Sequence, residues 1–268
     1  MSSSVINLSL PEGITQTAFL FMLVLSRISA AIMVMPGFSY SEIPSMIKAG
    51  LALTLTFLIY PLIHIPPISH NISPWEIGGM VALELFIGFF IGWITQLTAF
   101  ILPIAGQFIS VFIGLSSVLQ PDQSLGADTS ALARFMNLLA PVMLMVSGAY
   151  IFPIYGLINS YSLISPNIFF HNNISIMVAN DITKSVIQKT EDIFKISLEL
   201  SSPFLILSLI WQMIIGVLTR LSPNLQIQNN VSSLQMLGGI ALVGISLVAM
   251  ITVWQQHTFT ILQNLSGF

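Results

Sequence analysis

The chain has 268 residues, of which 55% are hydrophobic and only 6% are charged, and it contains no cysteine. Ten acidic and seven basic residues are too few to cover a globule of this size, so the composition predicts a membrane-embedded protein. A net charge of −3 provides no basic face for phosphates, which excludes nucleic acid as a partner, and the lack of cysteine excludes disulfides, thiolate catalysis and iron–sulfur ligation.

The apolar runs, taken in chain order, predict an all-α fold. Residues 1–13 contain no Lys or Arg, so they lack the basic region of a cleaved signal peptide. We therefore expect the first helix to remain in the mature protein. A membrane span needs about 20 apolar residues. On that criterion the candidate spans are residues 14–35, 47–65, 75–100, 101–119, 131–160, 203–221 and 232–262. The connections are short and rich in turn residues, which favours antiparallel, kinked or interrupted helical hairpins in a single all-helical domain over residues 1–268.

The third and fourth runs leave two possibilities open. Pro103 and Gly106 lie near their junction. They indicate either a turn between two helices or a kink within one helix.

Two charged residues lie in the interior of apolar runs. Arg27 lies inside the first run and Glu84 inside the third. An arginine within a span costs about 2.5–3.5 kcal/mol on insertion scales, so it should face a partner, a cavity or the interface. We interpret Arg27 as a snorkelling or helix-packing residue, with a role in transport as the alternative, and Glu84 in the same way.

Glu84 begins a row of residues that recur every four positions, followed by Gly88, Gly92 and Gln96. This spacing places all of them along one face of a helix. Gly88 and Gly92 form a GxxxG pair, which lets another backbone approach closely but often reflects only ordinary helix packing. The row predicts a close-packed helix seam with one polar anchor.

The segment from Phe112 to Pro121 is apolar, contains small residues and ends at a proline. It predicts either a helix end followed by a loop or a non-helical apolar segment buried in protein at membrane depth. Asp128 or Thr129 is expected to be the N-cap of the next helix.

Residues 181–200 are unusually rich in charge, and apolar residues at helical spacing lie on the other side of this segment: Ile182, Val186, Ile193, Ile196 and Leu200. The pattern predicts an amphipathic helix that begins outside lipid as a solvated extension and runs into the apolar stretch after Pro203.

Enzymatic signatures are absent, because the chain has no HExxH, Walker A, GxSxG or GxGxxG sequence. Its four histidines are scattered, with no carboxylate at metal-ligand spacing. We therefore expect no enzyme, no catalytic residues, no cofactor and no metal. A secondary transporter or small-solute channel is the alternative function, since broken helices near a midplane site suit that class. It would require polar residues converging from two repeated halves, and the sequence shows no repeat.

Several stretches, in order along the chain, resemble the FliR family of type III export-gate proteins. They are Arg27-Ile-Ser followed by Pro36-Gly-Phe, Pro44 and Ile47-Lys48-Ala-Gly-Leu-Ala-Leu; Leu83-Glu84 through Gly88 to Gly92; Ala105-Gly106-Gln107 through Gly114-Leu115-Ser116; Ser160-Tyr161 through Pro166; and Gly216-Val-Leu-Thr-Arg220-Leu-Ser-Pro223-Asn-Leu-Gln. Their order and spacing cover nearly the whole chain. Arg220 and Pro223 in the last motif join Arg27, Glu84, Gly88, Gly92 and Gln96 as candidate helix-packing or polar anchors.

The chain departs from the family pattern at two places. Where the family usually has a Pro-Leu-Lys step, this chain has Ser233-Leu234-Gln235, and a Gly-His pair of the family is represented by Gly148-Ala149. The first departure leaves open whether this chain makes the partner contacts of the missing lysine.

The resemblance implies a subunit that assembles with P-type and Q-type subunits into a helical, pore-forming export gate. Unfolded flagellar or virulence proteins would pass through this pore, in the bacterial inner membrane at the base of the flagellar basal body or injectisome. The larger export-gate membrane proteins and membrane lipid are further expected partners. The sequence of residues 216–226 favours the flagellar system over the injectisome.

The resemblance also implies an apolar plug in the closed pore. By position the plug consists of Phe112, Ile113, Gly114, Leu115, Ser116, Ser117, Val118 and Leu119. Phe112, Ile113 and Leu115 would exclude water and ions by apolar packing. The glycine and the two serines would let the segment move.

Overall fold

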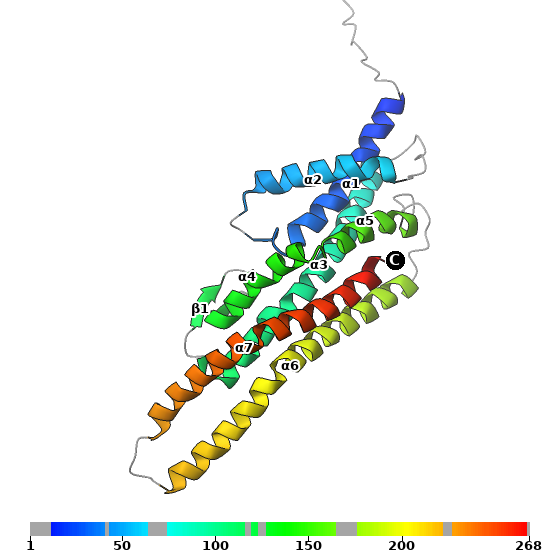
Figure 1. Cartoon of the computed structure of the whole chain (residues 1–268). Helices are drawn as coiled ribbons and strands as arrows, with labels where there is room; N and C mark the ends of the chain where they lie inside the picture. The colour runs from blue at the N-terminus through cyan, green and yellow to red at the C-terminus, as the bar shows by residue number, and fades with distance from the viewer. Residues whose placement is uncertain are drawn as a thin grey trace, which may run out of the picture. The chain divides into compact units, whose positions relative to one another are not determined.

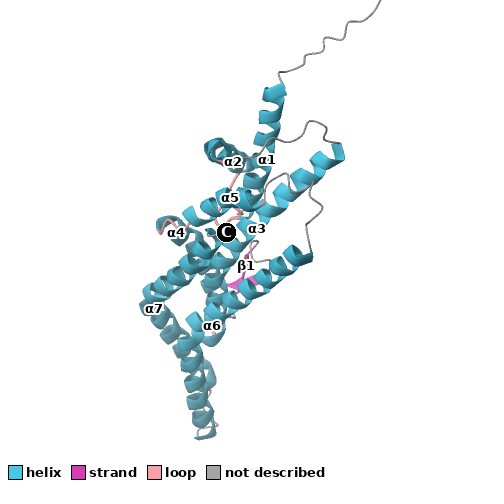
Figure 2. Ribbon diagram, turned by 90° about the vertical axis from the view of Figure 1, so that its right-hand side faces the viewer, coloured by secondary structure: helices cyan, strands magenta, loops and turns pink. Residues whose placement is uncertain are grey.

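The structure is a computed structural model of the whole chain, and it describes residues 12–40, 43–63, 74–115, 119–122, 127–164, 176–221 and 227–266. Within these ranges the elements are, in chain order, α1 (Glu12–Val34), α2 (Ser45–Ile59), the 3-10 helix η1 (Tyr60–Leu62), α3 (Pro74–Phe112), β1 (Leu119–Asp122), β2 (Ala127–Ser130), α4 (Ala131–Val146), α5 (Ile151–Leu163), α6 (Ile176–Leu221) and α7 (Ile227–Ser266) (Figure 1). The expected all-α architecture is confirmed, and β1 and β2 add one short antiparallel hairpin to it (Figure 2).

Five of the described helices are long and apolar enough to cross a membrane: α1, α2 together with η1, α3, α6 and α7. Helices α4 and α5 meet the same criterion only as a broken pair. The expected span over residues 131–160 is thus two helices, separated at residues 147–150.

A glycine explains the break between α4 and α5. Gly148 has a φ of 72°, in the left-handed region that ends helices. Its amide donates to the carbonyl of Met145 at 3.1 Å, and the Ala149 amide donates to that of Leu144 at 3.0 Å. This pair of bonds is the Schellman arrangement, which satisfies the last carbonyls of α4.

Helix α3 joins the two expected spans 75–100 and 101–119 into one helix, with Pro103 inside it. Proline removes a backbone donor and crowds the preceding turn, so nearby carbonyls need other partners. The carbonyl that loses its regular donor is that of Ala99, four residues before Pro103. Two neighbouring carbonyls receive side-chain donors from other helices. Trp254 Nε1 donates to the Thr98 carbonyl and Ser197 Oγ to the Ile101 carbonyl, both at 3.1 Å. Of the two possibilities, one continuous helix is therefore correct, and it ends at Phe112.

The expectation that Asp128 or Thr129 caps α4 is wrong. Both residues lie in β2, where Asp128 is the backbone partner of Pro121 and Thr129 of Gln120. Ser130 is the N-cap, and its hydroxyl accepts a hydrogen bond from the Ala133 amide at 3.2 Å.

Helix α6 includes both the charged segment and the apolar stretch after Pro203 in one helix, as expected, and the position of its charged part outside lipid stays a prediction. Ile193, Ile196 and Leu200 are buried, whereas the charged residues Glu191, Lys195 and Glu199 are exposed. Figure 1 shows α6 and α7 as long helices that run in opposite directions.

The chain divides into two compact units. The first comprises Met1–Trp93, Pro153–Asp181 and Leu265–Phe268, and the second comprises Ile94–Phe152 and Ile182–Asn264. A core of the first unit contains buried residues from α1, α2 and α5: Val24, Ile28, Ile32, Ala52, Ile59 and Tyr161. The single domain expected over residues 1–268 stays a prediction.

Candidate functional site

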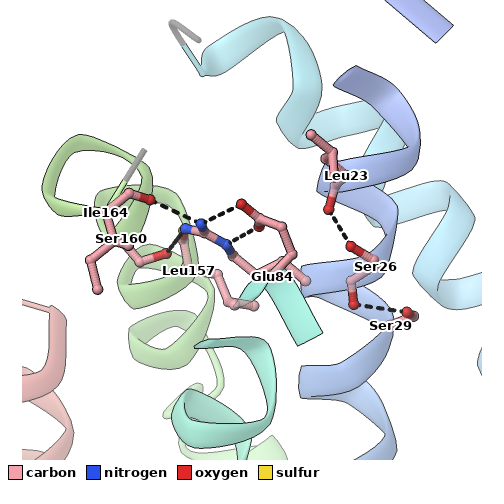
Figure 3. A network of polar contacts seen from close by, with 8 residues as sticks. Leu23, Ser26, Ser29, Glu84, Leu157, Ser160 and Ile164 are labelled. Atoms are coloured by element: carbon pink, nitrogen blue, oxygen red, sulfur yellow. Dashed lines mark hydrogen bonds and ion pairs between the residues drawn. The ribbon is translucent and has the colours of Figure 1, made fainter. Parts of the chain in front are cut away.

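Arg27 and Glu84 form a buried ion pair between α1 and α3, within the first unit. Both side chains are 0% exposed. The guanidinium binds the carboxylate with two hydrogen bonds, from Nε to Oε2 at 2.5 Å and from Nη2 to Oε1 at 2.9 Å (Figure 3). Such fork-shaped pairing is the strongest that arginine makes with a carboxylate.

The remaining side of the guanidinium is bound by α5 and the residue after it. Nη1 donates to Ser160 Oγ at 2.8 Å and Nη2 donates to the Ile164 carbonyl at 3.0 Å (Figure 3). The guanidinium carbon lies 3.8 Å from the ring centroid of Tyr161, in the position of a cation–π contact. Arg27 therefore ties together three helices. This geometry favours the helix-packing interpretation over snorkelling, since the charge is bound inside the unit.

The glycines that follow Glu84 let α1 and α3 touch backbone to backbone. A Cβ atom at Gly88 would overlap the Arg27 carbonyl group, and one at Gly92 would lie 2.5 Å from the Ala31 carbonyl oxygen. By contrast, a Cβ at Gly78 of the same helix would meet nothing within 4 Å. The close-packed seam thus lies at Gly88 and Gly92, directly beside the ion pair.

The other candidate anchors lie elsewhere. Gln96 is half-buried in the part of α3 that belongs to the second unit, and its Oε1 is a buried atom with no hydrogen-bond partner among the described residues. Arg220 is exposed in the last turn of α6. Pro223 lies outside the described residues. A packing role for these three residues stays a prediction.

The candidate plug begins where α3 ends, in the second unit. Phe112 is the last residue of α3, Ile113 is 3% exposed, and Gly114 has a φ of 78°, which turns the chain out of the helix. Leu115 is half-buried. Ser116, Ser117 and Val118 lie outside the described residues, and Leu119 begins β1.

The chain returns from the candidate plug onto the last turns of α3. Ser110 Oγ donates to Ser130 Oγ at 2.7 Å, and the Ser130 amide donates to Gln107 Oε1 at 3.2 Å. A Cβ at Gly106 would lie 3.0 Å from the Ala133 Cα, so α3 and α4 approach closely here. The segment between Gly114 and Ser130 is therefore held at its far end by α3 itself.

Comparison with known proteins now decides the family. Residues 18–261 match the model of the family described as bacterial export proteins, family 1. The chain belongs to this family. It is 27% identical over 234 residues to flagellar biosynthetic protein FliR of Caulobacter vibrioides, covering 87% of this chain and 90% of that protein. It is 26% identical over 243 residues to FliR of Escherichia coli, covering 90% and 88%. These matches confirm the resemblance to the FliR family.

A relative with a different name matches over a shorter range. Surface presentation of antigens protein SpaR of Shigella sonnei is 26% identical over 142 residues, which cover 53% of this chain and 52% of that protein. Members of this export-protein family thus occur under both flagellar and antigen-presentation names.

The sequence pattern alone does not pair Arg27 with Glu84. A signal is present, because the two residues carry opposite charges and each lies in the interior of an apolar run. Ser160 and Tyr161 belong to the family-like stretch that ends at Pro166, and the sequence does not show that both contact the guanidinium of Arg27. The contact of Gln235 with the end of α3, from Nε2 to the Phe112 carbonyl at 2.9 Å, had no sequence signal beyond a departure from the family pattern.

Proposed function

We propose that this protein is a subunit of the type III export gate and forms, with P-type and Q-type subunits, the pore through which unfolded proteins cross the inner membrane. The observation that carries the proposal is the family match, which extends over residues 18–261 and so includes nearly every described element. The protein acts as a structural subunit and not as an enzyme.

The length of α3 supports an assembly over a set of independent spans. Its apolar stretch, Trp75–Phe112, has 38 residues and is therefore about 57 Å long. The hydrocarbon core of a bilayer is about 30 Å thick. A single crossing of the core uses only about 20 of these residues. Part of this apolar helix must therefore be covered by protein.

Exposed apolar side chains on other helices require cover as well. On α2, Met46 is 85% and Phe57 is 75% exposed, and on α6, Met213 is 74% exposed. Both lipid and neighbouring subunits suit such surfaces. The P-type and Q-type subunits and the larger export-gate membrane proteins are the partners that we assign to them, together with lipid.

The buried polar cluster argues against the transporter alternative. A solute site needs polar groups that are free to bind the solute. Here the guanidinium of Arg27 already makes four hydrogen bonds to groups of its own unit. These bonds hold α1, α3 and α5 together, which favours a packing role for the cluster over a solute site.

The segment Phe112–Leu119 is the plug of this pore in our proposal. Its apolar residues close the resting pore against water and ions, and Gly114 allows the chain to leave the helix. We also place the protein in the flagellar system, at the base of the basal body, because the similarity to FliR proteins covers 87% of the chain and that to SpaR only 53%.

Purification of the tagged protein from membranes tests the assembly. We expect it to leave the membrane in a complex with two other helical subunits of the P-type and Q-type, identified by mass spectrometry. A tagged soluble protein of the same host and an unrelated membrane protein at equal abundance serve as controls. A stable monomer that moves a small solute in vesicles would contradict the proposal and favour the transporter.

A further inference from the structure

The end of α3, where the candidate plug begins, is attached to the neighbouring helix α7 within the second unit. Gln235 Nε2 donates a hydrogen bond of 2.9 Å to the Phe112 carbonyl. The last four carbonyls of any helix lack partners within that helix, so this amide satisfies a group that would otherwise need another donor.

A second contact lies one turn further along α7. A Cβ at Gly239 would lie 2.5 Å from both Cβ and Cγ2 of Ile113, so the side chain of Ile113 rests directly on the Gly239 backbone. Ile113 is 3% exposed, and Gly239 is buried. Gln235 and Gly239 are four residues apart, which places them on the same face of α7.

Immediately after these contacts the backbone turns out of the helix at Gly114. Gly114 adopts a φ of 78°, and a Cβ there would meet nothing within 4 Å. The far end of the segment is held by the bonds of Ser130 to α3. The two ends are thus fixed by different helices: the far end by α3 itself and the near end by α7.

We propose that Gln235 and Gly239 form a latch, in which α7 holds the near end of the plug, Phe112–Leu115, against the end of α3 until the latch opens. A displacement of α7 would break both contacts together, because they lie on one face of one helix. Gln235 is then a positioning residue, since it acts through the Phe112 carbonyl. The inference rests on the proposed function only in taking Phe112–Leu119 as the plug.

Cysteine labelling in the assembled membrane complex tests the latch, because the chain contains no cysteine of its own. Leu115→Cys is introduced as the reporter, and its rate of reaction with a small maleimide is measured on this chain. Removing one neutral hydrogen bond shifts a local opening equilibrium by roughly two- to twelvefold. We expect Gln235→Leu to raise the labelling rate by that factor and Gln235→Lys, which keeps a donor, to restore the parental rate.

Gly239→Ala and Gly238→Ala form a matched pair for the second contact. Gly239→Ala displaces Ile113 and should also raise the labelling rate, whereas a Cβ at Gly238 meets nothing within 4 Å and should leave it unchanged. If Gly239→Ala prevents folding, the comparison of Gln235→Leu with Gln235→Lys still tests the latch. A second reporter, Leu144→Cys, lies at a residue that is 2% exposed and should stay protected in all variants.

Equal labelling of Leu115→Cys in the parental, Gln235→Leu and Gln235→Lys backgrounds would overturn the latch. So would a parallel rise at Leu144→Cys, because that would show loss of the whole fold. Ion leakage across the membrane is recorded in the same variants. Faster labelling without leakage would support the latch and contradict the plug assignment, which separates failure of this inference from failure of the proposed function.

Discussion

Replacing Arg27 by methionine should destabilise the protein far more than its position in an apolar helix suggests. The substitution leaves the Glu84 carboxylate at 0% exposure without its cation. Removing one partner of a buried ion pair costs about 3–5 kcal/mol. Because whole domains are stable by only about 5–15 kcal/mol, Arg27→Met should remove a large share of the stability and lower the thermal midpoint and the abundance of the protein.

The double variant Arg27→Met/Glu84→Met should be less affected than either single variant. Replacing a buried pair by apolar side chains of similar volume is often neutral. Ser160 keeps the hydrogen bond that its hydroxyl donates to the Leu157 carbonyl at 2.6 Å. The Ile164 carbonyl loses its donor, which costs about 1–3 kcal/mol. We therefore expect the double variant to be more stable than Arg27→Met by about 2 kcal/mol.

The assay is the thermal midpoint of the fluorescently tagged complex in detergent, together with its abundance in membranes, for the parent, both single variants and the double variant. Arg220→Met serves as the matched control, because it removes an arginine that is exposed in the last turn of α6. Strictly additive losses in the double variant would refute the reasoning, since they would mean that Arg27 and Glu84 do not stabilise one another.

Gly88→Ala should lower the thermal midpoint by the equivalent of about 1–3 kcal/mol, because the new Cβ overlaps the α1 backbone. Gly78→Ala on the same helix should leave the midpoint unchanged, and equal midpoints of the two variants would contradict the seam. Ser130→Ala should cost about 1 kcal/mol by removing the cap of α4 and the bond to Ser110, seen as a lower midpoint, and an unchanged midpoint would argue against the cap. Deletion of residues 114–117 should make cells leak ions, whereas alanines at both serines of that segment should not; an intact barrier with normal secretion would exclude the plug assignment.

The helices were predictable because long apolar runs have few alternatives in a membrane. Their breaks were less predictable, since they depend on contacts from other helices. Pro103 lies inside α3 without ending it, and Trp254 and Ser197 from other helices donate to the nearby Thr98 and Ile101 carbonyls; no local pattern shows these contacts. The break at Gly148 depends on a left-handed backbone that glycine permits but does not require.

The candidate site was predictable in its residues and not in its geometry. Glu84, Gly88 and Gly92 were expected on one seam, and all three do face α1. Periodicity defines a face of one helix but not the helix that covers it, so the sequence left the partner of Arg27 open. The cap of α4 was misplaced because three consecutive residues, Asp128 to Ser130, are all good caps, and pairing in the hairpin decides between them.

The buried ion pair also imposes an order in time on the synthesis of the chain. Glu84 lies 57 residues after Arg27, and Ser160 lies 133 residues after it. At about 5–20 residues per second, Arg27 is synthesised about 3–11 s before Glu84 and about 7–27 s before Ser160. During that interval α1 carries an uncompensated charge, which opposes its release into lipid. The first helix therefore enters its final place only as part of a group, after the ribosome has produced the helices that neutralise it.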